Sequence, residues 1–128
     1  MSNAERVVMY AQYLTENGFP PEVYQDEVRF KFEGGLYQIF AFDDQDYFRI
    51  VYPNFHPFRA SEREKVEIAA INAIGSTKAA KVVVYEDNVS VAVELFFSPH
   101  AGFRDVFRRI IGALQYAVQA FEKELAAQ

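Results

Sequence analysis

Three aspartates, Asp43, Asp44 and Asp46, form the densest group of possible metal ligands in the chain. Their carboxylate oxygens could bind a hard cation. However, a calcium loop needs further oxygen ligands at set spacings and a closing glutamate, which do not follow here. Because aspartate is also typical of turns, we interpret the group as a solvated hairpin turn.

The remaining candidates for catalysis are isolated from one another. His56 and His100 are the only histidines, and neither belongs to a metal-ligand or general-base pattern. Ser98 lacks the G-x-S-x-G context of a nucleophile, and its position favours a helix N-cap. Gly34 and Gly35 lack the lysine of a phosphate loop, so they indicate a turn. We therefore expect no catalytic residue, no metal, no cofactor and no enzymatic activity.

Composition excludes several classes of partner and compartment. The 128 residues carry 13 basic and 18 acidic side chains, a formal net charge of −5, and this balance argues against binding nucleic acid. The local basic excess is interpreted as solvated helix surface; it comprises Arg59, Arg63, Arg104, Arg108 and Arg109. No apolar run approaches the roughly 20 residues that span a bilayer, and the start resembles no signal peptide. The absence of cysteine fits a reducing compartment, so we expect a cytoplasmic protein without membrane contact.

Changes of hydrophobic period predict an α+β fold with the order helix, three strands, helix, two strands, helix. A capping box formed by Ser2 and Glu5 begins the first helix, and Asn17-Gly18 ends it. Ser61 and Glu64 suggest the same start for the second helix, which ends at Gly75. The predicted helices cover residues 5–17, 61–75 and 99–125, and the predicted strands cover 27–32, 36–42, 47–52, 81–86 and 89–97.

These strands predict a five-stranded antiparallel sheet with helices packed on it, in a single domain over residues 1–128. Strand 27–32 is expected at an edge, and a primed turn at Asp87-Asn88 is expected to join the last two strands. The long third helix carries an apolar stripe from Phe103 to Leu125. With the first and third helices on one face of the sheet, Tyr37, Ile39 and Val51 are expected to face the other way.

Several segments together resemble the YbjN-like family of proposed bacterial sensory-transduction regulators, whose fold is similar to that of type III secretion chaperones. They are LTENGF at 14–19, VRFKFEG at 28–34, DYF at 46–48, INAI at 71–74, AKVVVY at 80–85 and the hairpin through Asp87-Asn88. The resemblance implies a small, acidic, often dimeric protein that holds other polypeptides, and it supplies no catalytic residues. The chain departs from the family near the end of the second helix, where Asn72 is followed by Gly75-Ser76 rather than by a second asparagine.

We therefore predict a protein-binding module that acts as a chaperone-like or regulatory adaptor for another polypeptide, and that forms a homodimer. The surface expected to be free for these contacts combines sheet, loop and helix residues: Tyr37, Ile39, Val51, Phe55, Phe58, Val66, Ala70 and Ala73. Two alternatives stay open. One is a type III secretion chaperone proper, and the other is a small-ligand-binding protein with a pocket near the loop 55–59.

Overall fold

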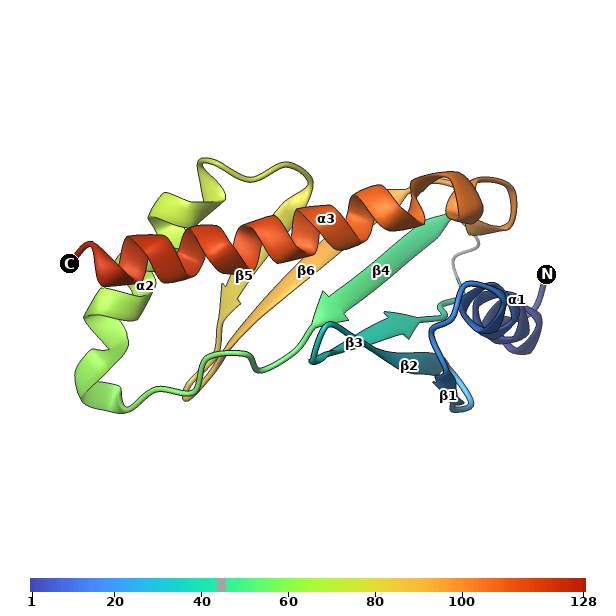
Figure 1. The fold of residues 1–128 in the computed structure, drawn as a ribbon, viewed down its shortest axis with the longest axis horizontal. Coiled ribbons are helices and arrows are strands. Elements are labelled where there is room, and N and C mark those ends of the chain that lie inside the picture. Colours follow the sequence, from blue (N-terminus) through green and yellow to red (C-terminus); the bar gives the residue numbers. More distant parts are fainter. Residues whose placement is uncertain (44–45) are drawn as a thin grey trace. The chain divides into compact units, whose positions relative to one another are not determined.

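The computed structural model describes residues 1–43 and 46–128, so the predicted acidic turn, which includes Asp44, lies partly outside the described residues. The helices are α1 (Asn3–Glu16), α2 (Arg63–Ile74) and α3 (Pro99–Ala126), with a 3-10 turn η1 (Ala60–Glu62) before α2 (Figure 1). The strands are β1 (Pro21–Val23), β2 (Glu27–Phe32), β3 (Gly35–Phe40), β4 (Tyr47–Tyr52), β5 (Ala80–Val84) and β6 (Val89–Phe96).

The sheet has six strands in the order β1-β2-β3-β4-β6-β5, and the pairs β1–β2, β2–β3, β3–β4 and β5–β6 are antiparallel. The α+β class is confirmed, but the prediction of five strands is wrong because it omits β1. That strand has three residues and begins with Pro21, which is tolerated at the first position of an edge strand. The edge therefore lies at β1 and not at β2, as the sequence had suggested.

The chain divides into two compact units. The first comprises Met1–Val51 with Glu94–Phe107, and the second comprises Tyr52–Val93 with Arg108–Gln128. Each unit is described by itself. The expectation of a single domain over residues 1–128 stays a prediction.

In the first unit, the register of β2 and β3 is set by a two-residue turn. Glu33 and Gly34 both have positive φ, 49° and 81°, as a type I′ hairpin turn requires. The resulting pairs are Phe30 with Tyr37 and Val28 with Ile39. Since paired residues of antiparallel strands share a face, these four side chains lie on the same side of the sheet.

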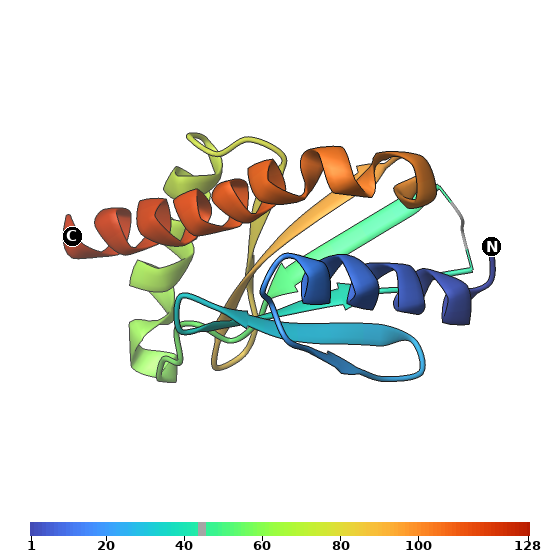
Figure 2. The ribbon, with the colours of Figure 1, turned by 45° about the vertical axis from the view of Figure 1, so that its right-hand side comes forward.

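This side of the first unit is covered by α1 and the first turns of α3. The ring centroids of Tyr10 and Phe103 lie 4.8 Å apart, and those of Tyr13 and Phe107 lie 5.1 Å apart. Phe107 also lies 5.7 Å from Phe30 of β2. Figure 2 shows α1 lying over β2, with which it is in contact. The predicted capping box of Ser2 starts α1, and Gly18, at φ 83°, follows its end.

In the second unit, α2 packs against β5 through small side chains. Val66, Ala69, Ala70 and Ala73 are buried there, which brings the helix close to the strand. The start of α2 differs from the prediction. A Glu62 carboxylate oxygen accepts a hydrogen bond from the Arg59 N–H at 3.0 Å, and Ser61 lies inside η1.

The β5–β6 hairpin of the second unit also differs from the prediction. The backbone N–H of Tyr85 donates to the carbonyl of Asn88, so the turn residues are Glu86 and Asp87. Among the described non-glycine residues, positive φ occurs only at Glu33, Asn54 and Ala79, so this turn is not a primed one.

Of the helices in the described ranges, none combines the length and the apolar character needed to cross a bilayer.

Candidate functional site

The face of the first unit's sheet opposite α1 carries a mixed surface of rings and charges, which we call the open face. Its side chains alternate along each strand with the core residues of β2, β3, β4 and the end of β6. They are Glu27, Arg29, Lys31, Leu36, Gln38, Phe40, Phe42, Tyr47, Arg49, Glu94 and Phe96, joined by Tyr24 beside β1.

Four aromatic rings form a continuous strip across the open face. Ring centroids lie 6.3 Å apart for Phe40 and Phe42, 4.9 Å for Phe42 and Tyr47, and 5.4 Å for Tyr47 and Phe96. Phe96 ends the strip and is 83% exposed. We call these four residues the aromatic strip. A phenylalanine so exposed contributes little to the stability of a single chain, since burial is what stabilises an apolar ring.

Glu94 fixes the middle of the strip through both of its carboxylate oxygens. The Tyr47 hydroxyl donates to Oε2 at 2.7 Å, and Arg49 Nε lies 3.5 Å from Oε1. The Arg49 guanidinium also lies 5.2 Å from the Phe40 ring centroid. Partial burial, together with the hydrogen bond to Glu94, raises the pKa of Tyr47 to about 12, so its phenol stays neutral at physiological pH.

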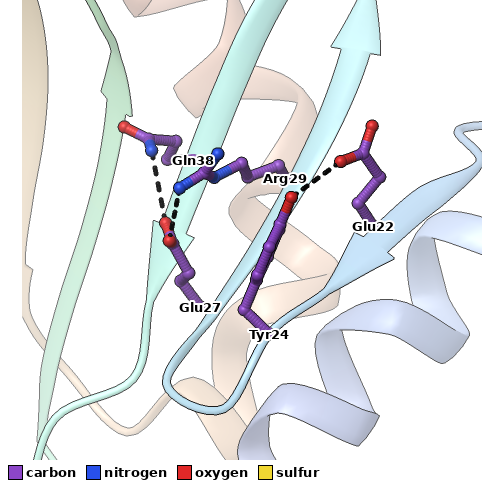
Figure 3. Close-up of polar contacts among 5 residues, drawn as sticks. All are labelled: Glu22, Tyr24, Glu27, Arg29 and Gln38. Atoms are coloured by element: carbon purple, nitrogen blue, oxygen red, sulfur yellow. Dashed lines mark hydrogen bonds and ion pairs between the residues drawn. The ribbon is translucent and has the colours of Figure 1, made fainter.

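A second cluster lies on β1, β2 and β3 (Figure 3). Glu27 is 2.8 Å from Arg29 Nη2 and accepts a hydrogen bond from Gln38 Nε2 at 3.2 Å. The Arg29 guanidinium lies 4.5 Å from the Tyr24 ring centroid, and the Tyr24 hydroxyl donates to Glu22 at 2.9 Å. This last hydrogen bond raises the pKa of Tyr24. In the view of Figure 3, no ribbon passes in front of these side chains.

The ring and charged side chains of the open face are held in defined orientations by contacts with one another. Its two arginines are held over rings and paired with carboxylates, and the rings of the aromatic strip are oriented by one another. Across residues 1–43 and 46–128, no group of three or more His, Cys, Asp or Glu side chains could hold a metal ion. What the arrangement offers is a patch of preoriented aromatic surface with charges at fixed positions.

Comparison with known proteins identifies the fold. No family model and no curated protein matches the chain. Among solved structures, the crystal structure of YbjN from E. coli, described as a proposed transcription regulator, matches with a TM-score of 0.65 and 13% sequence identity. The match covers 94% of this chain and 92% of that one. This chain has the YbjN-like fold. The resemblance in fold is thereby confirmed, while the further likeness to type III secretion chaperones stays a prediction.

The YbjN-like fold places two of the predicted surface residues in the core. Tyr37 is 1% exposed and Ile39 is 0% exposed, on the same face as Phe30 and under the helices. The expectation that they face away from the helices is wrong, because the two-residue turn pairs them with Phe30 and Val28. Val51 does lie on the opposite side, paired with Gln38, but it too is buried.

The loop between β4 and η1 does not display its aromatic rings as predicted. Phe58 is 7% exposed, and Phe55 is half-buried with its ring 5.5 Å from that of Phe121 in the second unit. The backbone explains this difference. The N–H of Phe55 donates to the carbonyl of Val89, and the N–H of Phe58 donates to the carbonyl of Asp87. These hydrogen bonds hold the loop against the β5–β6 hairpin, and its rings point inward.

The predicted interface residues of α2 pack within their own unit. Val66, Ala70 and Ala73 are buried within the second unit, so they are not free for a partner. The exposed apolar residues of α2 are Ile68, Ile71 and Ile74.

The small-ligand alternative placed a pocket near residues 55–59, where Phe55 and Phe58 instead pack within the unit. An open groove of about 530 Å³ lies elsewhere, between α1 and the start of α3, and its lining includes Val8, Met9, His100 and Arg104. The other histidine, His56, packs its ring 5.3 Å from that of Phe121.

Sequence reasoning missed the aromatic strip as a site, although its signal was present. The alternation of strands 36–42 and 47–52 groups Phe40 with Phe42 and Tyr47 with Arg49. What the alternation leaves open is which of the two groups the helices cover.

Proposed function

We propose that this chain is a non-enzymatic adaptor that binds another polypeptide through the open face. The aromatic strip carries the proposal. Four rings are in contact on the face opposite α1. Phe40, Phe42 and Tyr47 are half-buried there and Phe96 is 83% exposed, so among the described residues the strip presents a partly accessible apolar surface. Exposed apolar surface of this kind commonly marks an interaction site.

The chemistry of the open face favours a polypeptide as the partner. Protein interfaces are enriched in Tyr, Phe and Arg, the residue types that dominate this face. Glu94 orients Tyr47 through a hydrogen bond of 2.7 Å and lies 3.5 Å from Arg49 Nε before any partner arrives. Binding then costs less ordering of side chains than it would on a surface of unconstrained rotamers.

The YbjN-like fold supports a regulatory rather than a catalytic role for such an adaptor. YbjN is described as a proposed transcription regulator. A regulator can act on nucleic acid directly or through another protein. The formal net charge of −5 favours the second route here, because affinity for nucleic acid depends on neutralising phosphates with Lys and Arg.

A peptide array tests this function. The array carries 12-residue synthetic peptides of apolar, basic, acidic and mixed composition, and it is probed with the wild-type chain and with Phe96→Ser. We expect a subset of peptides to bind the wild type and to lose most of their signal with Phe96→Ser, because this change removes the most exposed ring of the strip.

Tyr116→Ser is the matched control, since Tyr116 is 52% exposed but lies on α3 in the second unit. It should leave the array signal unchanged. An array without bound peptides, or equal loss of signal in both variants, would refute binding at the open face. The secretion-chaperone alternative uses hydrophobic strips on the sheet and on the flanks of the helices and requires an unfolded client, so it gains support only if peptides bind while folded proteins do not.

A further inference from the structure

We infer that the open face takes an amphipathic helix of another polypeptide, with one apolar side chain from each turn of that helix lying along the aromatic strip. This inference rests on the proposed function and deepens it, because it names the structural and chemical class of the partner. Three observations carry it: the spacing of the rings, the packing on the covered face of the same sheet, and the balance of charge at the strip.

Successive rings of the aromatic strip are spaced like the turns of a helix. The two steps across the sheet lead from Phe42, just beyond the end of β3, to Tyr47 of β4 and on to Phe96 of β6. They measure 4.9 and 5.4 Å between ring centroids. One turn of an α-helix rises about 5.4 Å, whereas alternate residues of a strand lie about 6.6 to 6.8 Å apart. A helix that crosses the strands along the strip therefore keeps in step with the rings, and an extended segment falls progressively out of step.

The covered face of the same sheet is already packed by a helix in this way. Phe103 and Phe107 lie one turn apart at the start of α3, and their ring centroids are 5.3 Å apart. The Phe103 ring lies 5.8 Å from that of Phe48 on β4, and the Phe107 ring lies 5.7 Å from that of Phe30 on β2. This helix thus crosses the strands with one ring on each turn. A partner helix on the open face would repeat the packing on the other side and complete a helix–sheet–helix arrangement in the first unit.

The charges that contact the aromatic strip favour an uncharged stripe on the partner. The Arg49 guanidinium lies over the Phe40 ring. The Glu94 carboxylate accepts the hydrogen bond of the Tyr47 hydroxyl. Since Arg49 Nε and Glu94 Oε1 lie 3.5 Å apart, these two opposite charges offset one another. A helix with apolar side chains on its docked face and polar ones elsewhere matches such a surface, because the core of a protein interface is depleted of charged residues.

Addition of an extended segment to the sheet is the other way in which a polypeptide could dock, and the topology restricts it. Both β3 and β4 have a neighbouring strand on each side, so a partner cannot pair with the backbone beneath Phe40 or Tyr47. The pairing of β5 with β6 ends at Ala80 opposite Val93, and Phe96 lies beyond it. An extended segment that paired there would run alongside Phe96 but not over the rings of β3 and β4.

Two fluorescein-labelled 14-residue peptides of identical composition test the inference. Both contain four leucines among alanine, glutamine, glutamate and lysine. In the stripe peptide the leucines occupy positions two, six, nine and thirteen, which share one face of a helix, and in the alternating peptide they stand two positions apart. Anisotropy titrations with the wild-type chain should show the stripe peptide binding at least about tenfold more tightly, since it buries more leucine surface against the rings. Circular dichroism of the mixture should show more helix than the sum of the separate spectra, because the peptide folds on binding.

Changes on both sides of the contact locate the effect. Phe96→Ser should weaken the stripe peptide by about tenfold, as expected for loss of the most exposed ring of the strip. Tyr116→Ser, which removes an exposed ring of the second unit, is the matched control and should leave the affinity unchanged. A proline at the centre of the stripe peptide should weaken binding by at least about tenfold, because it interrupts the helix and keeps all four leucines. Circular dichroism of each variant alone establishes that it is folded.

Equal binding of the two peptides, tighter binding of the alternating peptide, or binding that survives the proline would overturn the helical partner while leaving the proposed function standing. A wild-type dimer that becomes monomeric in Phe96→Ser would overturn it in favour of a second copy of the chain. Binding of a labelled ten-nucleotide oligothymidine that Phe96→Ser abolishes would overturn it in favour of nucleic acid. If neither peptide binds although the peptide array gives hits that depend on Phe96, the inference fails alone. If the array is also blank, the proposed function fails with it.

Discussion

At the scale of single residues, Glu94 contacts two neighbours in the middle of the aromatic strip. Its two carboxylate oxygens contact Tyr47 and Arg49, so one side chain fixes two neighbours. Both contacts are partly exposed, and a surface ion pair alone contributes little to stability. Their effect is therefore on orientation, which is what a preformed binding surface needs.

The phenol of Tyr47 offers a direct measurement of this arrangement. Its pKa is raised to about 12, and burial raises the pKa of Tyr10 to about 12 as well. A titration followed by tyrosinate absorbance should therefore show a late component above the ordinary range near pH 10. Tyr47→Phe should remove part of that component. Ionisation of all eight tyrosines in one step near pH 10 would contradict the burial and hydrogen bonding described here.

The same shifts predict how stability depends on alkaline pH. A phenol whose folded-state pKa lies above its unfolded value stabilises the folded state fully below about pH 10. This contribution is lost as the pH rises from about 10 towards 12, because the unfolded chain releases its protons first. Urea unfolding at pH 8 and at pH 11 should show a lower free energy of unfolding at the higher pH. In Tyr10→Phe the loss should be smaller, and an unchanged loss would exclude Tyr10 as a source.

At the scale of elements, the turn between β2 and β3 decides which side chains form the binding surface. Glu33 and Gly34 set a register in which Leu36 lies opposite Lys31 and Tyr37 opposite Phe30. A slip of one residue would exchange the two faces of a strand. The alternation of β3 was predictable from sequence, but its orientation was not, because both of its faces carry apolar residues and the length of the turn decides between them.

Two glycine substitutions with opposite expected effects on stability test this turn. Gly34 has φ 81°, so Gly34→Ala should destabilise the protein by about 1 to 2 kcal/mol, the cost of a Cβ in the left-handed region. Gly112 lies inside α3 with open space around it, so Gly112→Ala should stabilise by about 0.5 to 1 kcal/mol. Chemical denaturation of both variants provides the comparison. A neutral or stabilising Gly34→Ala would mean that the turn is not of the I′ type.

Some signals local in sequence were predicted well, although the start of α2 and the turn after β5 were not, and signals that depend on distant contacts were missed. The capping box of Ser2 and the start of α3 at Pro99 each involve residues within one turn of each other. The inward rotation of Phe58 depends on a hydrogen bond to Asp87, and β1 forms only because β2 is there to pair with it. Neither contact leaves a pattern in its own segment.

The apolar stripe of α3 gives a further prediction at this scale. Leu114 lies mid-stripe and is fully buried, so Leu114→Ala should lower the free energy of unfolding by about 2 to 5 kcal/mol, through lost burial and the cavity left behind. Its neighbour Tyr116 is exposed, and Tyr116→Ala should cost well under half as much. Thermal and urea denaturation of the two variants measure the difference. Equal effects would mean that Leu114 does not dock against the core.

At the scale of the whole molecule, exposed apolar side chains remain in the part of the chain that the structure describes. They include Phe96 at the end of the aromatic strip and, on the outer side of α2, Ile68, Ile71 and Ile74. A helix that is apolar on both sides is typical of one buried on both sides. We therefore retain the expectation of a homodimer but assign its contact to these isoleucines, because Val66, Ala70 and Ala73 are already occupied by packing within the second unit.

Substitutions on the exposed side and on the buried side of α2 should have different effects on the dimer. Sedimentation at micromolar concentration should show a wild-type dimer, and Ile71→Asp should give a folded monomer, since it places a charge in the intermolecular contact without touching the core. Ala70→Arg should instead unfold or aggregate the protein, because it places a charge inside the chain itself. Phe96→Ser should leave the dimer intact, as the open face is a different surface. A monomeric wild type, or an Ile71→Asp variant that still dimerises, would show that the isoleucines of α2 do not join two copies.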